Sequence, residues 1–351
     1  MTTPVEISWF SALCDDDYEF LGQNEPALQS SWEHCRNIVL AAEEAGFDNI
    51  LLPNGYQLGI DTAAFAAAIA TQVKRIKLLM AVRVGELWPP QLARQIATIN
   101  QILGGRLNVN IISSEMPGEV LDGPARYERT LEAITILRAL LAGEGLDHQG
   151  RFWNLKLDPA RILTGTACPP LYFGGLSEPA REVAAKGCDV YLMWPDRLEN
   201  VRAVVADMKA RAAREGRQLK YGYRVHVVVR ETEAEARAAA DRLLSKLDAA
   251  TGAAIKAKSL DTQSVGVAAQ VALREAAAGD GYVEDHLWTG IGRARSGCGA
   301  AIVGDPDQVL AKLQAYRQAG IDAFVLSGYP HAREADLFAR YVLPRIDHAP
   351  F

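Results

Sequence analysis

The segment PPLYFGGLSEPAREVAAKGCDVYLMW, residues 169–194, contains the pattern that decides the fold. PLYFGG (170–175) is an apolar run ending in two glycines, Ser177 opens a helical pattern, and DVYLMW (189–194) is a second apolar run. Short runs that are hydrophobic at nearly every position are typical of parallel strands buried on both faces. The segment therefore predicts a strand, a helix and a second, parallel strand.

The same alternation extends over the whole chain. Eight β-rich runs are each followed by a helical pattern, and eight such units close a parallel sheet into a (β/α)₈ TIM barrel without free edges. We therefore predict one barrel domain with insertions over residues 1–351; an open, doubly wound sheet is the alternative. The expected strands are residues 6–10, 49–53, 75–82, 106–113, 170–175, 189–194, 223–229 and 322–328.

Some helix ends and one hairpin are also indicated. Gly46 follows a helical pattern and suits a helix C-terminus, and Asp61 precedes another and suits an N-cap. HQGRFWNLKL (148–157) has the pattern of a hairpin.

One long segment interrupts the alternation. Residues 248–304 have many Gly, Ala and Ser residues and little strand pattern. Excursions of this length within a compact domain are usually functional or disordered. Because this one lies just before the eighth strand, we expect a mobile lid over the mouth of the barrel; a solvent-exposed insertion is the alternative.

Composition excludes several classes of function. The net charge of −6 and the pI near 5.6 argue against a nucleic-acid partner, which usually requires a basic face. No apolar run approaches the roughly 20 residues that span a bilayer, and the first residues lack a secretory pattern. The five cysteines form no CxxC pair. These features predict a cytoplasmic protein with reduced thiols and without a membrane partner.

The familiar cofactor and metal motifs are missing from the sequence. It contains no HExxH, EF-hand loop or His/Cys cluster, and we therefore expect no metal site. It also contains no Walker A loop, GxGxxG fingerprint or GxSxG elbow, which argues against ATP, classical NAD binding and an α/β-hydrolase triad.

The active site of a TIM barrel lies at the C-terminal ends of its strands. This rule selects a set of residues that are unusual for a barrel core. They are Arg83, Ser113, Gly175, Trp194, Arg224, His226, Tyr329 and His331.

The seventh expected strand, YRVHVVV, carries the most informative pair. Arg224 and His226 are two residues apart, so that their side chains point to the same face, while Val225, Val227 and Val229 face the other way. We expect the valines to face helices and the Arg–His pair to face the interior. A buried arginine–carboxylate pair and an anion pocket are both compatible with this pattern.

Three further patterns have both a structural and a functional interpretation. Gly175 and Ser177 could form a phosphate cradle at a helix start, or Ser177 could be an ordinary N-cap. Arg295 could capture an anionic group, or it could be solvated together with Arg293. Trp194 could wall an aromatic cofactor or fill a hydrophobic gap.

Taken together, several motifs resemble the bacterial luciferase-like flavin monooxygenases, and among them the FMNH₂-dependent alkanesulfonate monooxygenases. The resemblance covers roughly residues 5–347. The motifs that carry it are LARQIATINQILGGRLNVNI (92–111), RYERTLE (126–132), PPLYFGGLSEPAREVAAKGCDVYLMW (169–194), RVHVVVRET (224–232), LWTGIGRARSG (287–297) and VLSGYPH (325–331).

The resemblance implies roles for individual residues. Tyr127 and Ser177 would contact the FMN phosphate, and Arg295 would close on a sulfonate from the lid. The remaining pocket residues would be Arg224, His226, Trp194, Tyr329 and His331.

The resemblance also implies a two-component reaction. A separate NAD(P)H-dependent flavin reductase would supply FMNH₂, and this enzyme would use O₂ to cleave the C–S bond of an organosulfonate, giving an aldehyde and sulfite. Members of the family associate through barrel helices, so that we expect a homodimer or homotetramer.

Two loops depart from the family pattern. The loop at 54–65 lacks the cysteine that many relatives carry, and Ile-Ser-Ser (112–114) replaces a Val-Thr-Gly and runs into Glu115. These differences keep open an oxygenase that acts on another organosulfur or a non-sulfonate substrate. A non-catalytic flavin-binding protein and a deazaflavin-dependent enzyme are further alternatives.

Overall fold

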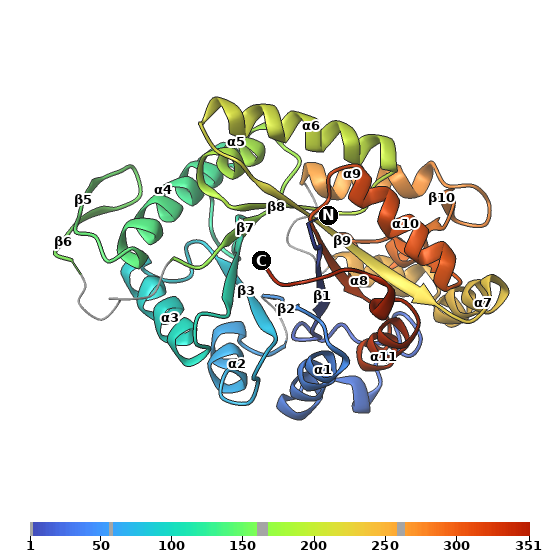
Figure 1. Cartoon of the computed structure of the whole chain (residues 1–351). Helices are drawn as coiled ribbons and strands as arrows, with labels where there is room; N and C mark the ends of the chain where they lie inside the picture. The colour runs from blue at the N-terminus through green and yellow to red at the C-terminus, as the bar shows by residue number, and fades with distance from the viewer. Residues whose placement is uncertain (1–2, 56–58, 160–167, 258–263) are drawn as a thin grey trace.

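The structure is a computed structural model that describes residues 3–55, 59–159, 168–257 and 264–351. Within these residues, eight parallel strands form a closed ring that is surrounded by helices (Figure 1). The strands are β1 (Glu6–Phe10), β2 (Asn49–Leu52), β3 (Lys77–Arg83), β4 (Leu107–Ile112), β7 (Leu171–Phe173), β8 (Val190–Met193), β9 (Lys220–Val229) and β13 (Ala323–Ser327).

The order of neighbours around the ring is β9, β13, β1, β2, β3, β4, β7 and β8, and pairing of β8 with β9 closes it. The predicted TIM barrel is therefore confirmed, and the open doubly wound sheet is wrong. The surrounding helices are α1 (Trp32–Ala45), α2 (Thr62–Ile69), α3 (Pro89–Ile102), α4 (Gly123–Leu141), α5 (Glu178–Gly187), α6 (Leu198–Arg214), α7 (Glu233–Leu244), α10 (Pro306–Gln318) and α11 (His331–Tyr341).

The expected helix ends and the hairpin are also confirmed. Gly46 follows α1 with φ of 94°, a left-handed conformation that glycine adopts without strain. The Asp61 side chain accepts a hydrogen bond from the backbone N–H of Ala64 as the N-cap of α2. Strands β5 (Leu146–Gln149) and β6 (Asn154–Leu157) form the antiparallel hairpin.

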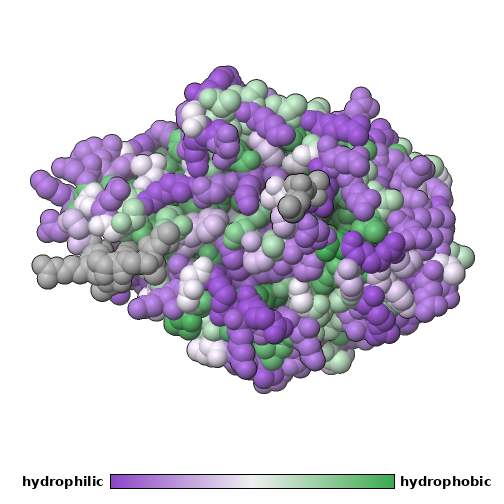
Figure 2. Space-filling view, viewed as in Figure 1, coloured by the Kyte–Doolittle hydropathy of each residue, from purple (hydrophilic) through white to green (hydrophobic). Residues whose placement is uncertain are grey.

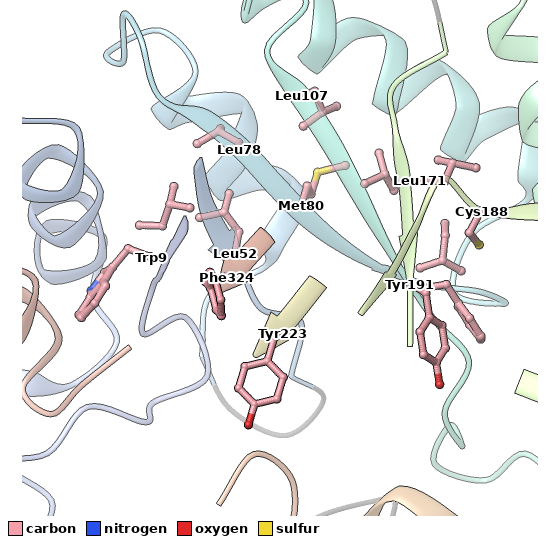
Figure 3. Close-up of a cluster of buried hydrophobic side chains, with 14 of the residues drawn as sticks. Trp9, Leu52, Leu78, Met80, Leu107, Leu171, Cys188, Tyr191, Tyr223 and Phe324 are labelled. Atoms are coloured by element: carbon pink, nitrogen blue, oxygen red, sulfur yellow. The ribbon is translucent and has the colours of Figure 1, made fainter. Parts of the chain in front are cut away.

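Each barrel strand has an outer face toward the helices and an inner face toward the barrel axis. Figure 3 shows part of the outer layer, where Trp9, Met80 and Tyr191 are among the buried side chains. Val225, Val227 and Val229 belong to this layer, as predicted. A second, smaller apolar cluster is made of Phe10, Leu51, Leu79, Tyr172, Val190 and Val325, which lie between the polar residues of the inner face.

A polar network lies at the N-terminal end of the barrel. Glu6 is fully buried and accepts hydrogen bonds from Asn49 and Tyr172, and a further one from the backbone N–H of Phe351. The Phe351 ring lies under the ammonium of Lys220, 3.4 Å from nitrogen to ring centroid. This end of the barrel interior is therefore filled by protein, which leaves the C-terminal end for a site.

The segment 248–304, in which the sequence shows little strand pattern, contains both helices and short strands. Its described residues form α8 (Ala249–Ala257), α9 (Val265–Glu275), β10 (Tyr282–Glu284), β11 (Leu287–Trp288), the 3₁₀ turn η3 (Gly290–Arg293) and β12 (Ala301–Gly304). Residues 258–263 of the expected lid lie outside the described residues. The three strands are only two to four residues long, which explains the weak strand pattern of this segment in the sequence.

Strand β12 joins this insertion to the barrel sheet. It runs parallel to β9, with Ala301 opposite His226 and Gly304 opposite Val229. Strand β9 is ten residues long because it pairs first with β8, then with β13 and finally with β12.

The surface seen in Figure 2 is the face where both chain termini lie. Hydrophilic residues cover most of it, with small apolar areas between them. Among the described residues, no helix combines the length and the apolar character needed to cross a membrane.

An ion pair ties the loop after β9 to the helix after β13. Arg230 donates two hydrogen bonds to Glu334, at 2.9 and 2.7 Å, and only 2% of the Glu334 side chain is exposed. Burial raises the pKa of Glu334, and Arg230 opposes this effect. The pair holds together the two segments that carry Arg224, His226, Tyr329 and His331.

Replacing Arg230 with methionine should lower the free energy of unfolding by about 3–5 kcal/mol, because it leaves a buried carboxylate without its partner. The measurement is the urea midpoint and m-value of the flavin-free protein. Arg340→Met is the matched control, since the exposed Arg340–Asp336 pair on α11 should contribute less than about 0.5 kcal/mol. Equal losses in the two variants would contradict this role of Arg230.

Candidate active site

Arg224 is a buried cation on the inner face of β9. The residue is 4% exposed, and its guanidinium carbon lies 4.3 Å from the centroid of the Phe10 ring. Nη1 donates to the carbonyl oxygens of Val225 and Val325, at 3.0 and 3.4 Å, whereas Nη2 is buried and has no hydrogen-bond partner in the described part of the chain. Among the described residues, no carboxylate forms an ion pair with Arg224, so that a buried arginine–carboxylate pair is wrong.

Burial lowers the pKa of Arg224, but a guanidinium stays charged at neutral pH. A buried charge without a counter-ion is costly. Its presence on the inner face of β9 therefore indicates a site where an anion supplies the missing charge.

His226 lies next to Arg224 on the same face of β9 and is fully buried. Its Nδ1 is 2.7 Å from the hydroxyl of Ser327, and its Nε2 has no hydrogen-bond partner among the described residues. Burial lowers the pKa of His226 far below its ordinary value, and the charge of Arg224 lowers it further. His226 is therefore a neutral imidazole.

Tyr329 and His331 follow β13 and complete this wall of the site. The Tyr329 ring centroid lies 5.1 Å from that of His226 and 5.2 Å from that of His331. His331 is fully buried, and its Nε2 also has no partner among the described residues. The structure thus brings together Arg224, His226, Tyr329 and His331, four of the residues selected from the sequence.

Arg295 reaches the same site from the insertion. Its Nη1 donates to Asp16 Oδ2 at 2.8 Å and also to the hydroxyl of Tyr329. Burial lowers the pKa of Arg295, but Tyr329 and Asp16 outweigh this effect and hold it well above the ordinary value. Arg293, by contrast, is exposed. Only one of the two arginines is therefore a candidate for anion capture.

The loop after β1 contributes residues that the sequence analysis did not select. Asp16 pairs with Arg295, and Asp17 lies 2.9 Å from His331 Nδ1 through one oxygen and 2.9 Å from His34 Nε2 through the other. Three consecutive aspartates at 15–17, in the loop that follows the first barrel strand, were the signal that could have revealed them, because such loops lie at the C-terminal ends of the strands.

The expected phosphate site lies between β7, α5 and α4. Ser177 is the N-cap of α5, and its side chain accepts a hydrogen bond from the Ala180 N–H at 3.4 Å. Gly175 has φ of 153°, and a Cβ there would lie 2.6 Å from the Ala180 side chain and 3.8 Å from the Tyr127 hydroxyl. The N-cap interpretation of Ser177 is confirmed. The Tyr127 hydroxyl therefore lies close to Gly175 near the N-terminus of α5, and helix N-termini favour anions such as phosphate.

Ser113 and Arg83 make contacts within the protein. Ser113 donates to the carbonyl of Arg126 at 3.3 Å and accepts from Thr130 at 2.8 Å, which anchors α4 near Tyr127. Arg83 lies 3.4 Å from both the Asn54 carbonyl oxygen and a Glu86 carboxylate oxygen. By strand order, β3 with Arg83 lies across the ring from β9 with Arg224.

A cavity of about 460 Å³ opens beside Arg83, at the C-terminal ends of β2 and β3. Its polar lining includes Asn54, Asp61, Glu86 and Gln95. This cavity borders the loop at 54–65, one of the two loops that depart from the family pattern; residues 56–58 of that loop lie outside the described residues. Glu115, in the other such loop, pairs with Arg126 at 2.9 Å.

Trp194 follows β8 and lies under the insertion. A Cβ at Gly266 or at Gly297 would each lie 3.1 Å from its ring, so that these glycines allow the close contact. The Gln270 side chain of α9 donates to the Pro195 carbonyl at 2.7 Å. Trp194 therefore joins the barrel to the insertion, and 36% of the residue remains exposed.

The arrangement can bind an anion and exclude water. Arg224 and Arg295 supply positive charge, and the Nε2 atoms of His226 and His331, which have no partner among the described residues, can each form a further hydrogen bond. Gly175, Ser177 and Tyr127 lie together at the N-terminus of α5.

Comparison with known proteins agrees with this geometry. The Luciferase-like monooxygenase family model matches residues 19–323. A protein of Novosphingobium aromaticivorans named sulfoquinovose monooxygenase is 69% identical over 353 residues, covering 98% of each chain. A protein of the same name from Agrobacterium fabrum is 51% identical over 344 residues, covering 97% of this chain and 89% of its own.

A solved structure shares the fold at low identity. The EDTA monooxygenase of Chelativorans sp. BNC1 superposes with a TM-score of 0.78 and 19% identity, covering 97% of this chain and 93% of its own. The family match and the two relatives named after sulfoquinovose together show that the chain belongs to the luciferase-like monooxygenases and is a flavin-dependent monooxygenase.

Proposed function

We propose that this enzyme cleaves the C–S bond of a sulfonated sugar of the sulfoquinovose type, using FMNH₂ from a separate flavin reductase and O₂, and releases an aldehyde and sulfite. The observation that carries the proposal is Arg224, a buried guanidinium without a counter-ion among the described residues, beside His226 and His331 with free Nε2 atoms. The names of the two relatives favour a sulfonated sugar over a linear alkanesulfonate.

The residues of the chain divide the work between the cofactor and the substrate. Tyr127, Gly175 and Ser177 would hold the flavin phosphate, and Ser113 keeps α4 in place beside them. When bound, the reduced flavin supplies the electrons that activate O₂. Arg224 and Arg295 bind the sulfonate, and its negative charge completes the pairing that Arg224 lacks.

The insertion acts as the lid of this site in our proposal. Arg295 belongs to the insertion and contacts Tyr329 at the barrel mouth. Trp194 follows a barrel strand and contacts two glycines of the insertion. Exclusion of water keeps the reactive oxygen species for the substrate and strengthens the interactions of the arginines with the sulfonate.

The first test is sulfite release. The enzyme, supplied with FMNH₂, NAD(P)H-dependent reductase and O₂, should release sulfite from sulfoquinovose with a kcat/KM at least about tenfold higher than from octanesulfonate, a difference of about 1.4 kcal/mol in transition-state binding. Sulfite is measured with a thiol reagent. Absence of sulfite from every sulfonate tested would contradict the proposal and favour a non-sulfonate substrate or a flavin-binding protein.

Arg224→Met should separate activity from folding. Loss of the cation that binds the sulfonate should lower kcat/KM by about 10²–10³-fold, while the free energy of unfolding of the flavin-free protein should stay the same or rise, since an uncompensated buried charge is removed. Activity and urea unfolding are measured side by side. Arg230→Met gives the opposite pattern for stability and serves as the control; a comparable loss of stability in Arg224→Met would assign Arg224 a structural role.

Arg295→Ala should uncouple the reaction, because it removes the contact of the insertion with Asp16 and Tyr329. We expect the ratio of sulfite formed to O₂ consumed to fall at least about threefold through loss of water exclusion. Arg293→Ala, two residues away and exposed, is the matched control and should keep the wild-type ratio. A wild-type ratio in Arg295→Ala would exclude this arginine from the lid.

A further inference from the structure

The barrel mouth contains two buried histidines in different electrostatic surroundings. Nδ1 of His226 lies 2.7 Å from the neutral hydroxyl of Ser327. The charged group that affects His226 most is the guanidinium of Arg224. Nδ1 of His331 lies 2.9 Å from the Asp17 carboxylate. Each ring leaves Nε2 without a partner among the described residues. Two like groups in opposite environments are the usual sign of separate acid–base roles.

Asp17 is held as a carboxylate by its surroundings. Its side chain is fully buried, and Oδ1 accepts hydrogen bonds from the backbone N–H groups of Tyr18, at 3.0 Å, and of His331, at 2.9 Å. Since His331 is the first residue of α11, the carboxylate also lies at a helix N-terminus, which favours negative charge. Burial raises the pKa of Asp17, but the charge of His331 and hydrogen bonds from His331 and His34 lower it below the ordinary value.

A carboxylate can only accept hydrogen bonds, so that the hydrogens between Asp17 and the two histidines belong to the rings. His331 therefore carries a hydrogen on Nδ1, and its buried Nε2 has no partner among the described residues. His34, on α1, binds the second carboxylate oxygen at 2.9 Å and has 15% of its side chain exposed. The carboxylate thus fixes the orientation and tautomer of His331, as the carboxylate of a catalytic triad does for its histidine.

We propose that Asp17 is a positioning residue that makes His331, and not His226, the histidine that takes up a proton in the active site. A proton on His331 Nε2 is balanced by Asp17. A proton on His226 would meet Arg224 on its own strand and Arg295 from the insertion, without a carboxylate in hydrogen-bond contact among the described residues. The Tyr329 ring lies close to both imidazole rings. Its hydroxyl accepts a hydrogen bond from Arg295, which also pairs with Asp16.

The role in the reaction rests on the proposed function. Insertion of one oxygen atom of O₂ at the carbon next to sulfur gives R–CH(OH)–SO₃⁻, while the other oxygen atom leaves as water with the electrons of the reduced flavin. His331 Nε2 then takes the hydroxyl proton, the O–H electron pair forms the C=O bond, and the C–S pair leaves with sulfite. The products are the aldehyde, SO₃²⁻ and a protonated His331.

The test is a pH titration of the histidine rings by ¹⁵N NMR on the flavin-free protein without substrate. The chain has six histidines, and His331→Gln and His226→Gln assign the two signals. In the wild type, Nδ1 of His331 should stay protonated throughout and Nε2 should titrate, whereas His226 should stay neutral. In Asp17→Asn, loss of the negative charge should move the midpoint of His331 to lower pH by at least about one unit.

Asp48→Asn is the matched control. Asp48 is also buried and binds a histidine, His348, at 3.0 Å, but it lies before β2 at the other end of the barrel. This variant should leave the His331 titration unchanged. An unchanged His331 midpoint in Asp17→Asn, an equal shift in Asp48→Asn, or titration of His226 in place of His331 would overturn the proposal. If Asp17→Asn does not fold, an unprotonated Nδ1 of His331 in the wild type would overturn it as well.

A kinetic readout separates positioning from a structural role. In Asp17→Asn, the acidic limb of the kcat–pH profile with a sulfonate should move to lower pH together with the NMR midpoint, with KM unchanged. A merely structural role would lower stability and raise KM without moving the limb. Because the NMR titration needs neither flavin nor sulfonate, failure of every sulfonate to react would contradict the proposed function and leave the assignment of His331 intact.

Discussion

The central constraint on this molecule is a guanidinium confined within a barrel. Strand geometry turns Arg224 inward, closure of the ring prevents it from reaching bulk water, and carbonyl oxygens and the Phe10 ring are its neighbours in place of a carboxylate. Such a group is tolerated only if the fold is stabilised elsewhere. The apolar layer between strands and helices, together with the Arg230–Glu334 pair just beyond the strand ends, provides that stability.

The acidic loop after β1 determines how the remaining positive groups behave. Asp16 forms an ion pair with Arg295, and Asp17 contacts both His331 and His34. Neither carboxylate forms an ion pair with Arg224 within the described chain. Arg295 therefore has a carboxylate partner in Asp16, whereas Arg224 has none in hydrogen-bond contact among the described residues.

Much of this organisation could be predicted from the sequence because it depends on periodicity. Eight apolar runs gave the barrel strands, and the alternation in YRVHVVV placed Arg224 and His226 inside and the valines outside. The N-cap role of Ser177 could be predicted from the sequence because capping is a local interaction. The flavin cofactor and the sulfonate substrate class were predicted from the family resemblance. The site residues could be selected because the C-terminal ends of the strands converge at one end of a barrel.

Other features depend on contacts between distant segments and left no local pattern. Strand β12 has four residues and is a strand only because β9 continues past β8 to meet it. Asp17 lies 314 residues from His331 in the sequence, and nothing in DDDY distinguishes the aspartate that meets the histidine from its neighbours. The contact between Trp194 and the glycines of the insertion likewise exists only once the chain has folded back on itself.

The pairing of β12 with β9 couples movements of the insertion to the barrel sheet. Ala301 of the insertion lies opposite His226 in one hydrogen-bonded ladder, and the backbone N–H of His226 donates to the Ala300 carbonyl at 3.0 Å. The insertion and the strand that carries Arg224 and His226 are therefore parts of a single sheet. A displacement of β12 would act directly on the backbone of His226.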